Sequence, residues 1–318
     1  MRLPYLVAAF ALTMVSTAMP AAAQKCDESC LLDIAGDYLD GLAANDISTV
    51  PFAPGVKATE NGVVSAPGEG IWKTAQMWLY RHTNVDPVTG EIVVLGSVSE
   101  GDGPDKKPLD ALTVVRLKVA SRKIVESELL VVRPGEFALF GPRTFTDPHP
   151  LFGAQVPVAK RSTRKELAAI GRGYFDALIQ GNPKRVAFHP DCNRWENGIQ
   201  TTNNPVRRSS SCAEGMRRFP YMHSYRDVRI PIIDQERGLV LAITAFDMPL
   251  QTRTIQLRKN KSFEVTPERN RLPRTLFLYE LFKIEGGRIR YIEAMMRNMP
   301  LGADLGWGGD KGNANHIE

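Results

Sequence analysis

The sequence carries one pattern twice. Glu60-Asn61-Gly62 recurs 136 positions later as Glu196-Asn197-Gly198, and Tyr38 and Tyr174 are separated by the same distance. Asp40 with Asp176, Phe52 with Phe188 and Pro54 with Pro190 keep this separation. Further matches keep the order with small insertions between them: Arg81–Gly90 with Arg229–Gly238, and Lys118–Glu128 with Lys283–Glu293. Such collinear matches favour two related domains in tandem over a short solenoid repeat.

Length and composition agree with two domains, and the N-terminus predicts export. The 318 residues are enough for two cores, and a hydrophobic content of 43% excludes wholesale disorder. Arg2 precedes an apolar run over residues 6–15, and the small residues Ala21 and Ala23 follow it, as in a signal peptide. We expect residues 1–23 to be removed and the protein to be periplasmic or secreted. No second apolar segment is long enough to span a membrane.

Export makes disulfides the expected state of the four cysteines. Three pairings are open, and we expect Cys26 with Cys30 and Cys192 with Cys212, one bridge within each half. The cysteines and histidines lack metal-ligand spacing, so no metal site is predicted. The net charge of +5 comes from scattered basic clusters without an aromatic platform, which argues against nucleic acid as a partner.

Each half begins with a helical pattern and continues in strands. Apolar residues recur at three-four spacing over residues 31–42 and again over 167–178, and alternating or β-branched runs follow. This order predicts an α+β class, with helices packed on one face of a curved antiparallel sheet in each half. We expect a first domain over residues 24–144, a linker over 145–162, a second domain over 163–300 and a flexible tail over 301–318, with Trp307 as a potential anchor.

The order of motifs resembles a known superfamily. An opening helix with YLDGLAAND or YFDALIQGN, a PFAP or AFHP segment, a Gly-led second helix and a closing GGRIRYIE strand are similar to the SnoaL-like branch of the nuclear transport factor 2-like superfamily. The TENG, ENGIQTTN and DQERGLV signatures resemble exported proteins with two such domains. The resemblance implies two cone-shaped domains, each enclosing an apolar pocket with a few polar groups at its floor.

The resemblance also implies a class of chemistry. Catalysts in this superfamily are commonly acid-base enzymes without a cofactor, and they include γ-formaldehyde lyases that act on lignin-derived aromatic dimers. We therefore expect no cofactor and a small apolar or aromatic ligand. The superfamily also contains plain binding modules, so the fold does not decide the activity.

Proton transfer in an apolar cone needs an acid and a base, and several polar residues of the second half could serve. The catalytic candidates are Glu196, His223, Arg229 and Asp247. The residues predicted to contact a ligand are Tyr38, Glu60, Trp72, Tyr80, Arg81, His82, Tyr174, Trp195 and Tyr225.

The twinned Glu-Asn-Gly has a structural and a catalytic interpretation. Asn-Gly is a turn signal, and the glutamate could accept hydrogen bonds from nearby backbone or from the twinned Arg81 and Arg229. Because both halves keep the motif, the structural interpretation is favoured. His82 and His223 lack a histidine in the other half, which makes them candidates for a function specific to one half.

Three hypotheses follow. The first is an exported cofactor-independent lyase or isomerase, in which a carboxylate or His223 removes a proton and an Arg or Tyr stabilises the oxyanion. The second is a non-catalytic pocket that binds the same class of ligand. In the third, one domain serves mainly for association, as a pseudo-dimer within the chain or in a homodimer.

Overall fold

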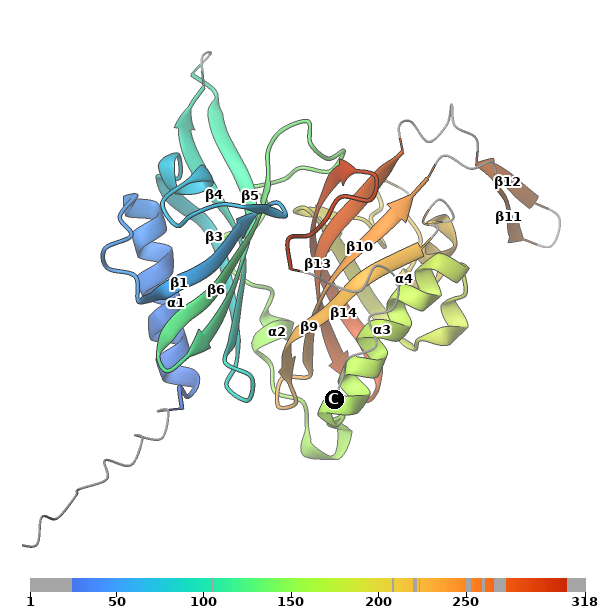
Figure 1. Ribbon diagram of the computed structural model, residues 1–318. Helices are drawn as coiled ribbons and strands as arrows, with labels where there is room; N and C mark the ends of the chain where they lie inside the picture. The colour runs from blue at the N-terminus through green and yellow to red at the C-terminus, as the bar shows by residue number, and fades with distance from the viewer. Residues whose placement is uncertain are drawn as a thin grey trace, which may run out of the picture.

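The computed structural model of the chain contains two domains of the same topology, placed sheet against sheet (Figure 1). It describes residues 25–103, 106–207, 209–219, 222, 224–249, 253–258, 261–265 and 273–307. The expected signal peptide and His223 lie outside these described residues.

The first domain is one helix and a short 3-10 turn on a six-stranded sheet. Its elements are α1 (Glu28–Ala44), β1 (Phe52–Glu60), β2 (Val63–Val64), η1 (Gly70–Lys73), β3 (Met77–Asp86), β4 (Glu91–Asp102), β5 (Pro108–Ala120) and β6 (Lys123–Val132), with strand order β2-β1-β6-β5-β4-β3. Asp27 caps α1 by accepting from the Cys30 amide, and Asn45 ends the helix with a left-handed backbone. The residues that the sequence assigned to the buried helix face, from Leu31 to Leu42, are buried.

The second domain repeats this plan. Its elements are α3 (Arg164–Gln180), η3 (Pro183–Arg185), β7 (Phe188–Glu196), β8 (Ile199–Gln200), α4 (Cys212–Gly215), η4 (Met216–Arg218), β9 (Ser224–Asp234), β10 (Leu239–Met248), β13 (Arg274–Glu285) and β14 (Arg288–Pro300), with order β8-β7-β14-β13-β10-β9. A separate hairpin, β11 (Arg253–Arg258) and β12 (Lys261–Val265), projects from this domain (Figure 1). Between the domains lie α2 (Pro150–Gly153) and η2 (Val158–Lys160).

The expected α+β class with two tandem cone domains is confirmed, with one correction. Each sheet is mixed, because β1 runs parallel to β6 and β7 runs parallel to β14. Alternation of apolar residues reports which face of a strand is buried and says nothing of its direction, so the sequence pattern could not reveal the parallel pair.

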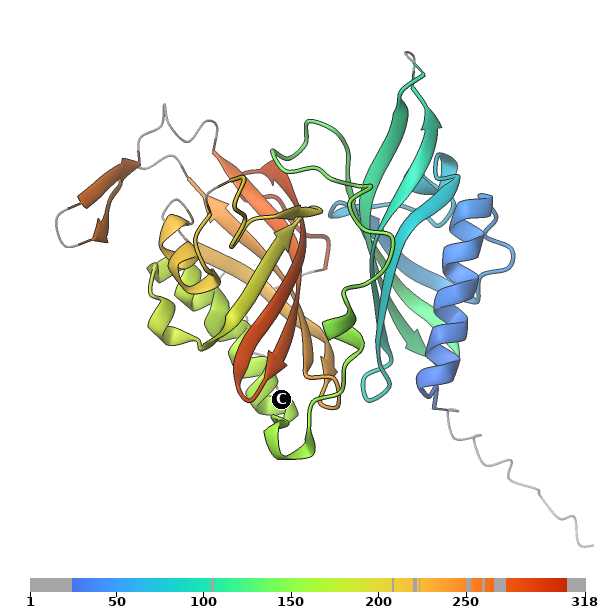
Figure 2. The ribbon, with the colours of Figure 1, turned by 180° about the vertical axis from the view of Figure 1, so that it is seen from behind.

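Both faces of each sheet are buried. On β5, Val115 and Leu117 pack toward α1, whereas Leu112 and Val114 pack into a core between the two sheets. The same core takes Leu241 and other residues from the second sheet, while α3 covers that sheet's outer face (Figure 2). The two domains therefore share a continuous apolar interface.

The twinned Asn-Gly turns have the same structure in both domains. Asn61 and Gly62 have φ of 52° and 80°, and Asn197 and Gly198 have 48° and 77°, which are the left-handed values of a type I′ hairpin turn. The side-chain oxygen of Asn61 accepts from the Val131 amide, and that of Asn197 accepts from Met296, both at 2.8 Å. Each asparagine thus fastens the hairpin to the neighbouring parallel strand, which is the structural role favoured by the repeat.

Both disulfides form as expected, one within each domain. Cys26 bonds Cys30 and Cys192 bonds Cys212, with Cα atoms 5.3 and 5.9 Å apart. The first bridge lies at the start of α1, and the second ties β7 to α4.

Candidate functional site

The interiors of the two cones differ. In the first domain, Tyr38 packs edge to face on Phe52 and on Trp72, and Phe52 lies tilted against Trp72, with ring centroids 4.9–6.2 Å apart. The space detected beside Trp72 is about 10 Å³. In the second domain, a cavity of about 950 Å³ lies between the sheet, α3 and the segment that follows β6. That volume is in the range of sites for drug-sized ligands.

Apolar side chains form most of the cavity wall. They come from α3, β10, β13, β14, the loop before β9 and the segment after β6: Phe137, Leu139, Leu178, Phe219, Met222, Phe246, Leu276, Leu278, Met296 and Met299. Met296 and Met299 of β14 both line the cavity.

Four polar residues gather in this wall: Tyr174 from α3, Arg194 and Glu196 from β7, and Glu280 from β13. Arg194 and Glu196 are two residues apart on one strand and therefore share a face. Arg194 Nε lies 3.0 Å from Glu196 Oε1, and Arg194 Nη1 donates to Tyr174 Oη at 3.1 Å. The guanidinium is also 4.7 Å from the centre of the Phe219 ring, a cation–π arrangement.

The charges of this cluster are set by burial and by one shared arginine. Burial raises the pKa of Glu280 to about 8. The charge of Arg194 and a hydrogen bond with Tyr174 oppose this rise, whereas the charge of Glu196 adds to it. Burial also raises the pKa of Tyr174 well above its usual value. For Arg194, burial opposes the charged form, but Glu196 and Tyr174 outweigh it and raise the pKa. At neutral pH the cluster thus combines a protonated carboxyl group with an ion-paired one.

The equivalent positions of the first domain cannot form this cluster. Tyr38 and Glu60 are kept, but Ala58 stands where the second domain has Arg194, and Val115 stands where it has Glu280. Glu60 instead accepts a hydrogen bond of 2.8 Å from the Ile71 amide at the start of η1. A Cβ added at Gly70 would lie 2.1 Å from Glu60 Oε2, so this turn requires glycine. The same glutamate is therefore structural in one domain and faces a cavity in the other.

The predicted catalytic residues do not converge on one place. Glu196 faces the cavity. Arg229 lies on the other side of the sheet and binds Glu128 of the first domain with two contacts of 2.6 and 2.7 Å. Asp247, at the end of β10, accepts from Arg226 at 3.0 Å and from Thr275 at 2.6 Å. Our proposal therefore retains Glu196 and leaves out Arg229 and Asp247, while His223 is outside the described residues.

The residues predicted to bind ligand also divide among several places. Tyr174 faces the cavity, whereas Tyr38, Glu60 and Trp72 belong to the filled first cone. Tyr225 donates to Asp176 at 2.7 Å. Trp195 packs on Phe145 in the space between the sheets, with ring centroids 5.0 Å apart.

Tyr80 and His82 contact the second domain instead of a cavity. Tyr80 Oη donates to Glu293 Oε1 at 2.9 Å, and His82 Nδ1 lies 3.0 Å from Glu293 Oε2. Arg81 is half-exposed and 3.8 Å from Asp40. The expectation that Arg81 and Arg229 pair with the twinned glutamate is thus wrong. Successive residues of a strand point to opposite faces of the sheet. In addition, β9 contains register shifts, which turn the Arg229 side chain toward the other domain.

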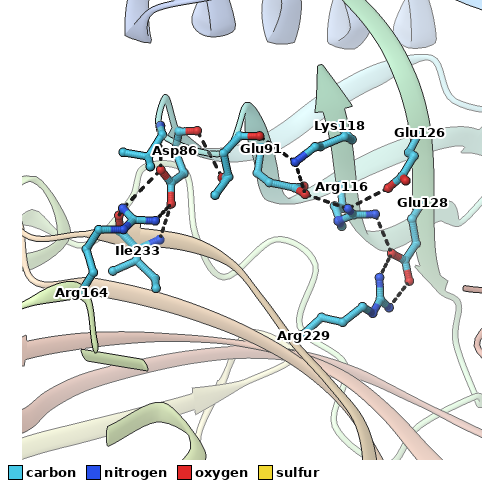
Figure 3. A network of polar contacts seen from close by, with 11 residues as sticks. Asp86, Glu91, Arg116, Lys118, Glu126, Glu128, Arg164, Arg229 and Ile233 are labelled. Atoms are coloured by element: carbon cyan, nitrogen blue, oxygen red, sulfur yellow. Dashed lines mark hydrogen bonds and ion pairs between the residues drawn. The ribbon is translucent and has the colours of Figure 1, made fainter. Parts of the chain in front are cut away.

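These interdomain contacts are related by the repeat. Glu128 and Glu293 are equivalent, and each is buried against a basic side chain of the other domain. His82 pairs across the sheet with Leu95 and Arg229 with Ile243, and these partners are themselves equivalent. Figure 3 shows the Glu128 half of this arrangement, together with the Arg164–Asp86 ion pair at 2.6 Å.

Arg194 and Glu280 were missed by the sequence reasoning, although each leaves a signal. Arg194 lies two residues before the twinned glutamate and has no counterpart in the first copy. Glu280 interrupts the apolar face of a strand that otherwise carries Leu276, Leu278 and Phe282. In both cases the signal is a charged residue at a position where the first repeat has an apolar one.

A family model described as a domain of unknown function (DUF8021) matches residues 160–296. This range contains Tyr174, Arg194, Glu196 and Glu280. No curated protein matches the chain.

Solved structures are similar to about a third of the chain. A protein of unknown function with a cystatin-like fold from Methylobium petroleophilum is 16% identical over 36% of this chain and 84% of its own, with a TM-score of 0.29. AclR, a putative hydroxylase from Streptomyces galilaeus, is 10% identical over 36% and 91%, with a TM-score of 0.30. An NTF2-like protein from Burkholderia thailandensis is 16% identical over 32% and 90%, with a TM-score of 0.24.

The part of the chain that the structure describes contains no helix long and apolar enough to cross a membrane. Within it, no three His, Cys, Asp or Glu side chains gather in a way that could hold a metal ion.

Proposed function

We propose that the protein is an exported, cofactor-independent lyase or isomerase that acts on a bulky apolar or aromatic small molecule in the second-domain cavity. A lignin-derived dimer is an example of such a molecule. The observation that carries the proposal is the pair of carboxyl groups, Glu196 and Glu280, in the same wall as the buried Arg194 of a largely apolar cavity of about 950 Å³. The signal-like N-terminus and the two disulfides support export.

The two carboxyl groups suit opposite roles. Glu196, ion-paired with Arg194, can accept a proton from a C–H or O–H group of the substrate. Glu280, whose pKa is raised to about 8, can donate a proton to the oxygen that becomes negative. Arg194 and Tyr174 lie beside the same groups and can stabilise that oxygen. One proton leaves the substrate and one enters it, so no redox partner is required.

A binding module without catalysis is the second candidate. It is supported by the mutual satisfaction of Arg194, Glu196 and Tyr174, which is also what the polar floor of a passive pocket requires. A single experiment separates the two functions. The purified protein is mixed with aromatic dimers, phenolics, polyketide-like lactones and fatty acids, thermal shifts are recorded, and each mixture that shifts is analysed by mass spectrometry.

A ligand that raises the melting temperature and is consumed identifies an enzyme. Turnover should then be lost in Glu196→Gln and in Glu280→Gln and retained in Glu60→Gln, the matched change in the filled cone. A ligand that raises the melting temperature but returns unchanged identifies a binding protein. If none of these compounds shifts the protein, the proposal of an apolar small-molecule site is wrong.

A further inference from the structure

Each twinned turn is covered by chain that follows the last strand of the other domain. Residues 133–143, which follow β6 and which we call the strap, reach the turn of the second domain. A Cβ added at Gly198 would lie 2.1 Å from the Gly141 carbonyl oxygen. Residues 301–307, which follow β14, reach the turn of the first domain, where a Cβ at Gly62 would lie 2.4 Å from the Asp304 carbonyl oxygen. The domains thus exchange their C-terminal extensions.

The strap is fastened to the second domain by hydrogen bonds. The Gly141 amide donates to the Asn197 carbonyl at 2.8 Å, and Asn197 Nδ2 donates to the Leu139 carbonyl at 3.1 Å. Nearer its start, Glu136 forms an ion pair of 3.0 Å with Arg297. Asn61, the equivalent of Asn197, has no such bond to the tail among the contacts of the described residues.

The strap is also fastened to the first domain. Arg143 forms a bidentate pair with Asp110, with contacts of 2.7 and 2.8 Å, and Ser97 Oγ donates to the Pro142 carbonyl at 2.6 Å. At its other end, Arg133 forms a bidentate pair with Glu100 at 2.7 and 2.6 Å. Bidentate Arg–carboxylate pairs fix position as well as charge. These contacts therefore fix the position of the strap relative to the first sheet.

The strap forms part of the cavity wall. Gly135, Phe137, Ala138 and Leu139 line the space that contains Glu196 and Glu280, and Phe137 packs against apolar residues of both neighbouring cores. Four lining residues therefore come from chain that is held by the first domain.

We propose that the first domain is a positioning element for the site of the second, acting through the strap, and that Phe137 is a specificity-determining residue for the cavity's ligand. This proposal rests on the proposed function, because it requires the cavity to hold a ligand. It assigns the domain with the filled cone a role that does not depend on a site of its own. Bringing the strap to one fixed place requires Arg143, Asp110 and Asn197.

The test measures binding of N-phenyl-1-naphthylamine, a neutral two-ring fluorophore, to the full chain. Phe137→Ala should weaken binding roughly tenfold, because apolar contact is lost. Arg143→Ala, which removes the bidentate pair between the strap and Asp110 of the first domain, should weaken binding up to roughly fivefold, as expected for loss of a half-exposed ion pair. Arg143→Lys should recover part of the affinity. Arg290→Ala, which removes an ion pair with Glu285 away from the strap, should leave binding unchanged.

The outcomes separate this proposal from the proposed function. If Leu278→Trp, which fills the cavity, abolishes binding while Phe137→Ala and Arg143→Ala leave it unchanged, the cavity binds ligand and the strap proposal is wrong. If the fluorophore does not bind the unmodified protein, the proposed function loses its support, and hydrogen exchange decides on the strap. Arg143→Ala should then speed exchange over residues 135–141 and 296–298 but not in α1; unchanged exchange there overturns the proposal.

Discussion

The side-chain amide of Asn197 donates a hydrogen bond to the carbonyl oxygen of Leu139 at 3.1 Å, so the turn of the second repeat holds the wall of its own cavity. The same amide donates to the Met296 carbonyl at 2.8 Å, while its oxygen accepts from the Met296 amide. In the first repeat, the side chain of Asn61 makes one hydrogen bond of this kind, to the Val131 amide. The asparagine that holds the turn in both repeats therefore also holds Leu139 of the strap in the second repeat.

This difference predicts unequal costs of the same substitution. Asn197→Ala should lower the free energy of unfolding by about 3 kcal/mol, because three hydrogen bonds are lost in a buried place. Asn61→Ala should cost about 1–2 kcal/mol, since both variants share the left-handed backbone but only one hydrogen bond is lost. Urea denaturation of the two variants measures the difference, and equal costs would contradict the assigned role of the Leu139 contact.

The raised pKa of Glu280 predicts how the free energy of unfolding changes with pH. Its pKa is about 8 in the folded protein and near 4.5 in the unfolded chain, so between these values the folded state holds a proton that the unfolded state has released. Stability should fall as pH rises through this window, by at most about 1.4 kcal/mol per pH unit from this group, and level off above pH 8. Glu280→Gln should remove that slope. Chemical denaturation of both proteins at several pH values provides the measurement; parallel curves would show that Glu280 does not carry the effect.

The ion pair between Arg229 and Glu128 predicts how much this interdomain contact contributes to stability. Its partner Glu128 is fully buried, and Arg116 is its other cation, at 3.6 Å. Arg229→Ala should therefore destabilise the protein by about 3 kcal/mol, because a buried carboxylate loses a bidentate partner. Arg81→Ala, the change at the sequence-matched but half-exposed arginine, should cost less than about 0.5 kcal/mol. Thermal unfolding compares the two. A similar loss in both variants would mean that the Glu128 contact is not a main support of the interface.

The two disulfides predict a graded response to their removal. The Cys192–Cys212 bridge closes a loop of 20 residues and the Cys26–Cys30 bridge one of 4. Chain entropy then predicts losses of about 3 kcal/mol for Cys192→Ser with Cys212→Ser, and about 2 kcal/mol for the other pair. Because the longer bridge ties β7, which carries Arg194 and Glu196, to α4, its removal should also weaken ligand binding. Unfolding and fluorophore titrations under non-reducing conditions measure both effects, and ligand affinity that survives the loss would exclude the bridge as a support of the cavity.

The sequence by itself determined the duplication, the α+β class and the Asn-Gly turns, and it favoured the disulfide pairing that the structure shows. These features depend on local spacing: three-four periodicity in α1 and α3, alternation in the strands, and backbone angles that Asn-Gly adopts readily. Only the tertiary structure decided which cone is filled, because Trp72 packs on Tyr38 inside the first cone, whereas the second cone has a cavity beside Tyr174. The tertiary structure also decided the partners of Arg229 and the placement of Glu280 and Arg194 in the same cavity wall. These contacts join residues far apart in sequence, and a register shift within one strand is enough to exchange the face on which a side chain lies.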